Sequence, residues 1–169
     1  MPEITVRHDI ECDEDTFWSK IVFDEGFNRK LYGENLKIGW TLKEQKDSDD
    51  KITRTVFVEP PTDNLPGPVR KVIGDKLAYT EEGSFDKKSK RYTFKVTPTT
   101  MAGKTKVRGE MWCEKKGDKK VTRICRISVE VKVFMVGGMV EERILSDLRV
   151  SYDKGTSYTN AYIKDNGLA

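Results

Sequence analysis

Histidine and cysteine are both scarce in this sequence, which limits the metal and redox chemistry that it can support. The chain has one histidine, His8, so a site built from several histidines is excluded. Its three cysteines, Cys12, Cys113 and Cys125, lie far apart and include no CxxC pair. That spacing fits neither a complete disulfide framework nor a zinc site. We therefore predict free, buried or half-buried thiols, no metal, and a reducing compartment, the cytoplasm.

Long apolar runs and a strong charge surplus are also lacking. No run approaches the ~18 apolar residues of a membrane-spanning helix, and the N-terminal segment has no apolar signal core. Lys and Arg number 31 against 28 Asp and Glu, a surplus too small to predict a nucleic-acid partner. The 169 residues fit one domain. We expect a cytoplasmic monomer, 1–169 in a single ligand-binding domain, that contacts membranes at most peripherally.

Common catalytic and cofactor motifs are absent as well. The chain has no GxGxxG, P-loop, HExxH or GxSxG pattern. Asp13, Glu14 and Asp15 lack the further ligands of a calcium site and suit the start of a helix. His8 lies on the apolar side of a strand pattern, where a paired core or rim histidine is more common than a catalytic one. We predict no catalytic residue and no cofactor.

Alternating apolar residues predict β-strands along much of the chain. A polar KDSDD segment joins two of them as a hairpin, and short lysine-rich links join later ones. The longest alternation runs from Val121 to Val133. The predicted strands cover residues 3–10, 36–42, 52–58, 76–85, 91–98, 106–115 and 121–135.

Helical spacing replaces this alternation in three places. Residues 13–33 predict two short helices after the first strand, and 65–74 a one-to-two-turn helix. Residues 139–163 predict a long terminal helix, with a kink or a close approach at Gly155. The resulting class is α+β: a curved antiparallel sheet of about six to seven strands wrapped around the C-terminal helix. Such packing tends to leave an apolar hollow between sheet and helix.

This order of elements resembles the helix-grip fold of the START and birch-pollen-allergen (Bet v 1) superfamily, also called SRPBCC. Two segments carry the likeness, TVRHDIECDEDTFWSKIVFDEGFNRKLY and GGMVEERILSDLRVSYDKGTSYTNAYI. They are similar to a bacterial START-like branch and, more distantly, to VASt sterol-transfer domains. The resemblance covers nearly the whole chain. It implies binding, and possible transfer between membranes, of a lipid, a sterol or another hydrophobic small molecule.

The inward side of the strands and of the long helix supplies the candidate ligand-binding residues. Tyr79, Tyr92, Arg54 and Arg123 would give the few polar contacts that orient an amphipathic ligand. The alternative is an ordinary packed core, and an error of one residue in register would move the strand set to the outer face. The full set is Trp40, Leu42, Arg54, Val56, Val58, Tyr79, Tyr92, Phe94, Met111, Arg123, Ile127, Leu148, Tyr152 and Thr159.

A closed cavity also needs a movable segment, and three stretches combine small with apolar residues. Nearby basic residues could attract anionic headgroups, at about 1 kcal/mol each near a charged membrane, or form a solvated face. They are Arg70, Lys71, Lys104, Lys106 and Arg108. The predicted gate or membrane-facing residues are Leu65, Pro66, Val69, Val72, Ile73, Met101, Met135 and Met139.

Two other functions stay open. The first is a cyclase- or hydrolase-like enzyme of the same superfamily, acting on an aromatic or polyketide-like substrate. It would use Tyr92, Glu110 or His8 as acid or base. The second is a co-chaperone-like module that binds another protein. Our leading hypothesis remains a noncatalytic carrier of a hydrophobic ligand.

Overall fold

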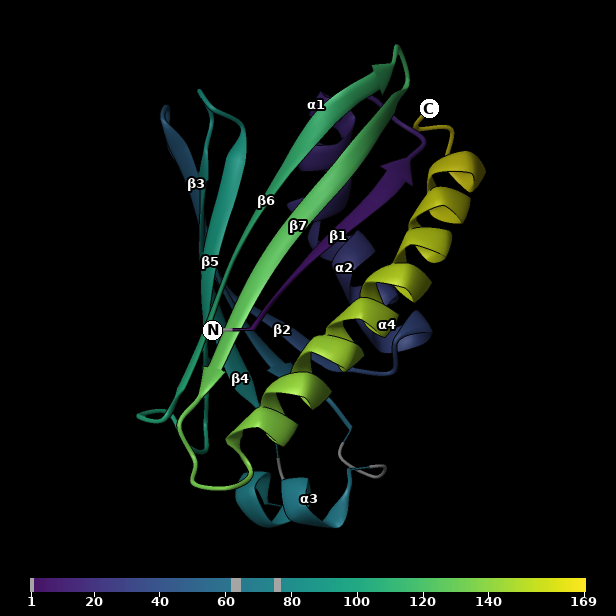
Figure 1. Cartoon of the computed structure of the whole chain (residues 1–169). Helices are drawn as coiled ribbons and strands as arrows, with labels where there is room; N and C mark the ends of the chain where they lie inside the picture. Colours follow the sequence, from purple (N-terminus) through teal and green to yellow (C-terminus); the bar gives the residue numbers. More distant parts are fainter. Residues whose placement is uncertain (1, 62–64, 75–76) are drawn as a thin grey trace.

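The computed structural model of the chain (Figure 1) describes residues 2–61, 65–74 and 77–169. Within them, seven strands form one antiparallel sheet in the order β1-β7-β6-β5-β4-β3-β2. Helix α4 (Gly137–Asp165) runs diagonally across one face (Figure 1). The predicted helix-grip arrangement of class α+β is confirmed. The strands are β1 (Glu3–Ile10), β2 (Gly39–Asp47), β3 (Lys51–Glu59), β4 (Tyr79–Asp86), β5 (Arg91–Pro98), β6 (Thr105–Gly117) and β7 (Lys120–Val131).

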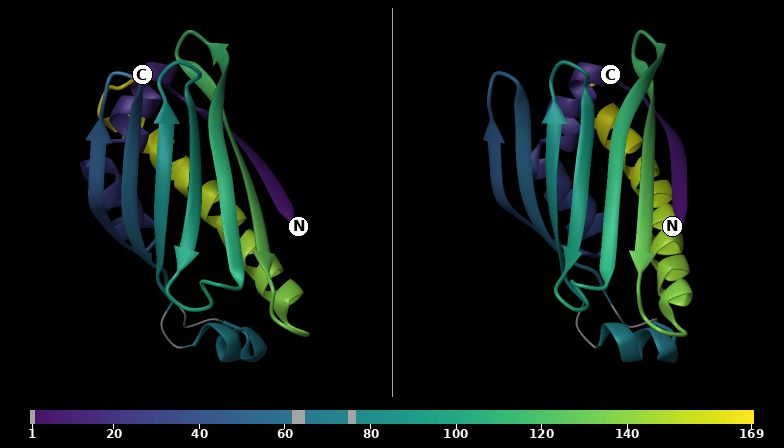
Figure 2. Two further views of the ribbon diagram at one scale, coloured as in Figure 1. Left: turned by 90° about the vertical axis from the view of Figure 1, so that its left-hand side faces the viewer. Right: turned by 60° about the vertical axis from the view of Figure 1, so that its left-hand side comes forward.

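Two short helical segments follow β1, as predicted. Each begins with an acidic cap: the carboxylates of Asp13 and Asp24 accept the N–H groups of Thr16 and Phe27 at 2.8 Å. These segments and α4 lie on the same side of the sheet (Figure 2). The first comprises α1 (Glu14–Thr16) and η1 (Phe17–Val22), and the second α2 (Glu25–Lys30) and η2 (Leu31–Asn35), with η1 and η2 as π-helical turns.

Three boundaries differ from the expectation. Strand β2 begins at Gly39 because Leu36 still belongs to the preceding turn, where its N–H donates to the Leu31 carbonyl at 2.9 Å. Strand β7 ends at Val131, since the chain turns at Met135 with φ 68°. The helix predicted over 65–74 is α3 (Gly67–Ile73), whose Val72 and Ile73 side chains lie outside the described residues.

The core lies between the sheet and the helices. Ile10 from β1 and Ile127 from β7 are at most 1% exposed, and Phe17, Phe27 and Ile163 meet them from the helical side at the same burial. The helices therefore cover the inner face, which is the concave face of the curved sheet (Figures 1 and 2).

Two strand glycines let aromatic rings lie flat on this face. A Cβ at Gly109 would lie 2.2 Å from Cζ of Phe94, and one at Gly83 would lie 1.9 Å from the Tyr92 hydroxyl. Tyr92 and Phe94 stack on each other with centroids 5.6 Å apart. Because no side chain stands below them, both rings run along the sheet instead of projecting toward α4.

Replacing Gly109 with alanine should therefore disturb the Phe94 ring. We expect Gly109→Ala to lower the free energy of unfolding by about 1–3 kcal/mol, the usual cost of overpacking, in urea denaturation. Gly33→Ala is the control, because no atom lies within 4 Å of its new Cβ and it sits in helical turn η2. A Gly109→Ala protein as stable as the parent would contradict the flat placement of the ring.

Candidate functional site

The predicted strand residues share the face that α4 covers. Cys125 of β7 donates from Sγ to the Tyr152 hydroxyl of α4 at 3.3 Å, which fixes the inward face of β7. Residues directly opposite in the antiparallel register share a face. By successive pairing this face includes Trp40, Leu42, Arg54, Val56, Val58, Tyr79, Tyr92, Phe94, Met111, Arg123 and Ile127. Their role in binding stays a prediction.

Burial on this face is uneven. Val56, Val58, Tyr92 and Ile127 are at most 2% exposed, and Thr159 of α4 has the same burial. Other side chains of the set keep accessible surface although they lie on the covered face. These half-buried residues are Trp40, Leu42, Tyr79, Met111, Leu148 and Tyr152.

Arg54 is the centre of one buried polar cluster. Its Nη1 donates to the Val22 carbonyl at 2.6 Å, and its Nη2 lies 3.4 Å from both Oε2 of Glu81 and the Tyr92 hydroxyl. Tyr92 donates to the same Glu81 oxygen at 2.9 Å. Burial, together with the Glu81 charge, raises the pKa of Tyr92, so the phenol remains a donor. The cluster is an Arg–Glu ion pair of zero net charge, bridged by the tyrosine hydroxyl.

Arg123 is the centre of a second cluster and is 7% exposed. Its Nη2 lies 2.9 Å from both Nδ1 of His8 and the Thr156 hydroxyl, and its guanidinium lies 5.0 Å from the Tyr152 ring centroid. Because arginine only donates, Nδ1 must accept, which leaves the imidazole proton on Nε2. Nε2 then donates to Asp153 at 2.6 Å. Both ring nitrogens of His8 are therefore occupied, as expected for a paired rim histidine.

Tyr32 is a half-buried aromatic residue beside the candidate face that the sequence pattern does not reveal. It belongs to η2 and stacks on Trp40 with centroids 5.9 Å apart. Burial raises the pKa of Tyr32 to about 12, with a further contribution from the Glu81 charge, against the effect of Arg54 and Arg123. Its phenol is thus neutral at ordinary pH. No period-2 pattern marks a residue in a helical turn, so strand alternation could not reveal it.

Glu81 was missed as well, although its signal is present in the sequence. It follows Tyr79 by two residues, and alternation therefore places it on the apolar face of the same strand. A carboxylate at such a position needs a buried partner, which here is Arg54. The neighbouring Glu82 points to the opposite face and is exposed.

The three cysteines are free, as predicted. Burial raises the pKa of Cys12 and Cys125 to about 11 and that of Cys113 to about 12, so all three are neutral thiols at ordinary pH. In the part of the chain that the structure describes, no group of three metal-ligating side chains comes together.

The predicted gate residues gather at one end of the molecule but differ in exposure. Val69 of α3 is fully buried, and Leu65 and Met101 are half-buried against the core. Met135 is 87% exposed and Met139 46%. Pro66 is exposed at the start of α3.

The corner between β7 and α4 also carries Phe134, which is 91% exposed. The alternating pattern predicts Phe134 within the last strand, so it does not mark this residue as exposed. The Lys132 N–H donates to the Lys104 carbonyl at 2.7 Å, which holds the corner against the turn between β5 and β6. An apolar tip flanked by two lysines therefore lies at the end of the molecule where α3 is found (Figure 1).

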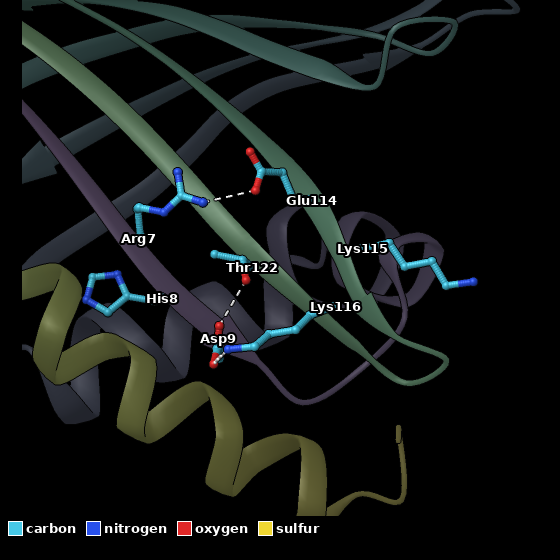
Figure 3. Close-up of a pocket in the computed structure, with 7 residues that line it drawn as sticks. All are labelled: Arg7, His8, Asp9, Glu114, Lys115, Lys116 and Thr122. Atoms are coloured by element: carbon cyan, nitrogen blue, oxygen red, sulfur yellow. Dashed lines mark hydrogen bonds and ion pairs between the residues drawn. The ribbon is translucent and has the colours of Figure 1, made fainter.

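Two surface grooves lie away from the region between the sheet and α4. One, of about 570 Å³, runs along the outer side of β1, β7 and β6 (Figure 3). There Asp9 accepts from Lys116 at 2.5 Å and from Thr122 at 2.9 Å, which lowers the pKa of its carboxyl, and Arg7 binds Glu114 at 2.9 Å. These charges neutralise one another, so we do not assign a ligand here. The other groove, of about 530 Å³, lies across β3 to β6.

Residues 5–163 match the family described as "Protein of unknown function (DUF2505)". The chain belongs to this family. No curated protein matches the sequence of this DUF2505 protein. Among the residues described, no helix is long and apolar enough to cross a membrane.

Solved structures confirm the START-like fold of this DUF2505 protein. TTHA0849 from Thermus thermophilus has TM-score 0.67 at 13% identity, covering 95% of this chain and 98% of its own. The Zhui aromatase/cyclase from Streptomyces sp. R1128 has TM-score 0.67 at 8% identity, and the match covers 96% of this chain and 93% of its own. A START superfamily protein from Mycobacterium smegmatis has TM-score 0.58 at 12% identity, covering 92% and 97%.

The pairing of Arg54 with Glu81 can be tested by stability. Glu81→Gln leaves a buried guanidinium without a carboxylate, and we expect the free energy of unfolding to fall by about 3 kcal/mol. The double variant Arg54→Met/Glu81→Gln should lose less than the sum of the single losses in a urea double-mutant cycle. Glu82→Gln, on the outer face, is the control and should change stability by under about 0.5 kcal/mol. Strictly additive losses would show that the pair is not coupled.

Proposed function

We propose that this protein binds a hydrophobic small molecule, such as a lipid, without chemical change, in a hollow between the concave face and α4. The observation that carries the proposal is the accessible surface on inward-facing side chains. Tyr79 on β4, Met111 on β6 and Leu148 on α4 are half-buried rather than closed off. A packed core leaves few voids larger than a water molecule. Partial exposure on several covered elements instead suits the wall of a ligand cavity.

Unpartnered hydroxyls support the same proposal. Tyr32 and Tyr79 are both half-buried, and burial raises the pKa of each phenol, so both are neutral at ordinary pH. Among the described residues, neither hydroxyl has a hydrogen-bond partner, and neither belongs to the fully enclosed unpaired atoms. Buried polar groups are usually hydrogen-bonded to protein or water. The two phenols therefore fit a space that holds water or the polar end of a ligand.

The mixture of apolar and polar side chains on this face also suits ligand binding. Apolar and aromatic side chains make most of the wall, while polar groups gather around Arg54 and Arg123, the usual composition of a small-molecule site. A long apolar molecule could lie against the flat rings of Tyr92 and Phe94. A fully apolar ligand would leave the polar groups unmatched, so an amphipathic lipid fits better than a hydrocarbon.

One observation favours an enzyme as the second candidate. The Tyr92 phenol donates to the Glu81 carboxylate at 2.9 Å beside Arg54, a pair that could move a proton on a bound aromatic substrate. Glu110, proposed from the sequence, instead binds Arg91 at 3.0 Å and Arg126 on the convex face. With both nitrogens of His8 occupied, an acid–base role would fall to Tyr92 and Glu81.

Filling the hollow should abolish binding. We expect protein purified from its own host or a lipid-rich lysate to carry a stoichiometric hydrophobic adduct in native mass spectrometry, identified by extraction. Leu148→Trp, which enlarges an inward side chain, should reduce the bound fraction at least about tenfold. A tenfold loss of affinity corresponds to about 1.4 kcal/mol of binding free energy. Val150→Trp is the matched control, because Val150 is 61% exposed on the same helix.

The other outcomes of this experiment are distinct. A clean apo mass that persists after incubation with mixed lipids and sterols would contradict the binding proposal. An added compound recovered with altered mass, and unaltered with Tyr92→Phe, would favour the enzyme.

We also propose that the apolar tip docks transiently on anionic membranes. Phe134, Met135 and Met139 are exposed beside Lys104 and Lys132, a combination suited to inserting apolar groups while the lysines face acidic headgroups. Isolated apolar residues on a surface are ordinary, but two neighbours about nine-tenths exposed form a local patch.

Docking would be measured by co-sedimentation with vesicles of phosphatidylglycerol and of phosphatidylcholine. We expect binding to the anionic vesicles, and Phe134→Ser/Met135→Ser should weaken it roughly tenfold through the lost apolar burial. The control Val150→Ser removes an exposed apolar group elsewhere and should bind normally. If the double variant binds the vesicles as well as the parent protein does, the apolar tip is not the docking surface.

A further inference from the structure

The two buried arginines differ in their charge partners. Nη2 of Arg54 lies 3.4 Å from the Glu81 carboxylate. Arg123, which is 7% exposed, donates to an imidazole and a hydroxyl, and in the described parts of the chain no carboxylate lies within ion-pair distance of it. The positive charge of Arg54 is therefore compensated in the interior, whereas that of Arg123 is not.

Asp153 compensates Arg123 only weakly. It reaches the guanidinium through the ring of His8, and its own side chain is 64% exposed. Solvent screens a carboxylate in that position, and the ring keeps the charges well beyond contact distance. Arg54, Glu81 and Arg123 together leave one unbalanced positive charge beneath the sheet. A buried charge without a counterion is strongly unfavourable, so an anion bound beside Arg123 would stabilise this part of the interior.

Arg123 also keeps donors that the protein does not use. Nε is enclosed and has no hydrogen-bond partner among the described residues, which is equally true of Nε of Arg54 and so does not distinguish the two. Nη1 donates to none of them either, yet it is not among the enclosed unpaired atoms and so retains accessible surface. Guanidinium donors match the planar geometry of a carboxylate. The adjacent Cys113 and Cys125 are neutral thiols and cannot serve as the anion.

Resting on the proposed binding function, we propose that the ligand is an amphipathic acid whose carboxylate is bound by Arg123. The accessible Nη1 makes the first contact. The apolar part of the acid lies along the half-buried wall that includes Met111 and Leu148. This ligand class differs from a neutral sterol, which would leave the guanidinium unpaired.

The experiment compares acids with neutral analogues of the same shape. Isothermal titration calorimetry would measure dodecanoate against dodecanol, and naphthoate against naphthylmethanol, on the full chain. We expect at least one acid to bind about tenfold or more tightly than its alcohol, as a charge-assisted pair implies. Arg123→Gln should lose that preference and bind the acid and the alcohol about equally, and Arg123→Lys should retain part of it.

Arg126→Gln is the matched control, because Arg126 lies three residues along β7 on the convex face and pairs with Glu110. It should keep the full preference for the acid. The wild-type comparison of acid with alcohol tests the inference even if Arg123→Gln does not fold. Equal affinity for acid and alcohol would overturn the acidic ligand but leave the binding function intact. A preference that survives in Arg123→Gln would overturn the assignment to Arg123, and no binding of any probe would count against both proposals.

Discussion

The position of α4 at one edge of the sheet is the constraint on which the rest of the interior depends. Asn160 clamps the end of β1: its Nδ2 donates to the Asp9 carbonyl at 3.0 Å, and its Oδ1 accepts the Glu11 N–H at 2.9 Å. About two helical turns earlier, Asp153 binds His8 of the same strand. The helix is thereby held over β1 and β7, and the short segments that follow β1 must cover the other strands. The concave face is thus covered by α4 over one part and by the short helical segments over the other (Figure 2).

The same contacts make the interior polar as well as apolar. Tyr152 and Thr156 serve the helix-to-sheet contact, yet they also surround the Arg123 guanidinium. A purely apolar contact would hold the helix without burying a charge, so structural need alone does not explain Arg123. Arg54 has an evident structural role, since it ties the Val22 carbonyl to Glu81 across the space beneath the sheet. The contrast between a neutralised and an unneutralised arginine is the main reason to regard the second as a ligand contact.

Most of the fold could be predicted from the sequence because period-2 alternation is unbroken in the long strands. In β7, Arg123 lies between Val121 and Cys125, which fixes its face without knowledge of the partners. The boundaries were less predictable: Leu36 alternates with Ile38 like a strand residue, but a hydrogen bond to Leu31 keeps it in the turn. Alternation records which way a side chain points. It does not record where the chain leaves the sheet.

The site was predicted only in part for a related reason. Strand periodicity found Arg54 and Tyr92 but passed over Glu81, because a carboxylate is not expected on an apolar face until its partner is known. Tyr32 lies in a turn with no periodic signal, and the pairing of His8 with Asp153 joins residues 145 positions apart. Such pairings depend on how the elements pack, so a single sequence does not reveal them.

Backbone conformation adds an argument about the end of the molecule that carries the apolar tip. Met101 and Met135 have φ of 59° and 68°, in the left-handed region that side chains other than glycine, asparagine and aspartate rarely occupy. Such residues cost of order 1–3 kcal/mol and persist where the surrounding structure requires them. The two turns are joined by the Lys132–Lys104 hydrogen bond, so two of the four such residues in the described chain meet at one corner, while Lys37 and Lys90 lie elsewhere. Strain there, beside side chains left in water, favours a corner shaped for contact with another phase over a loop that merely connects β7 to α4.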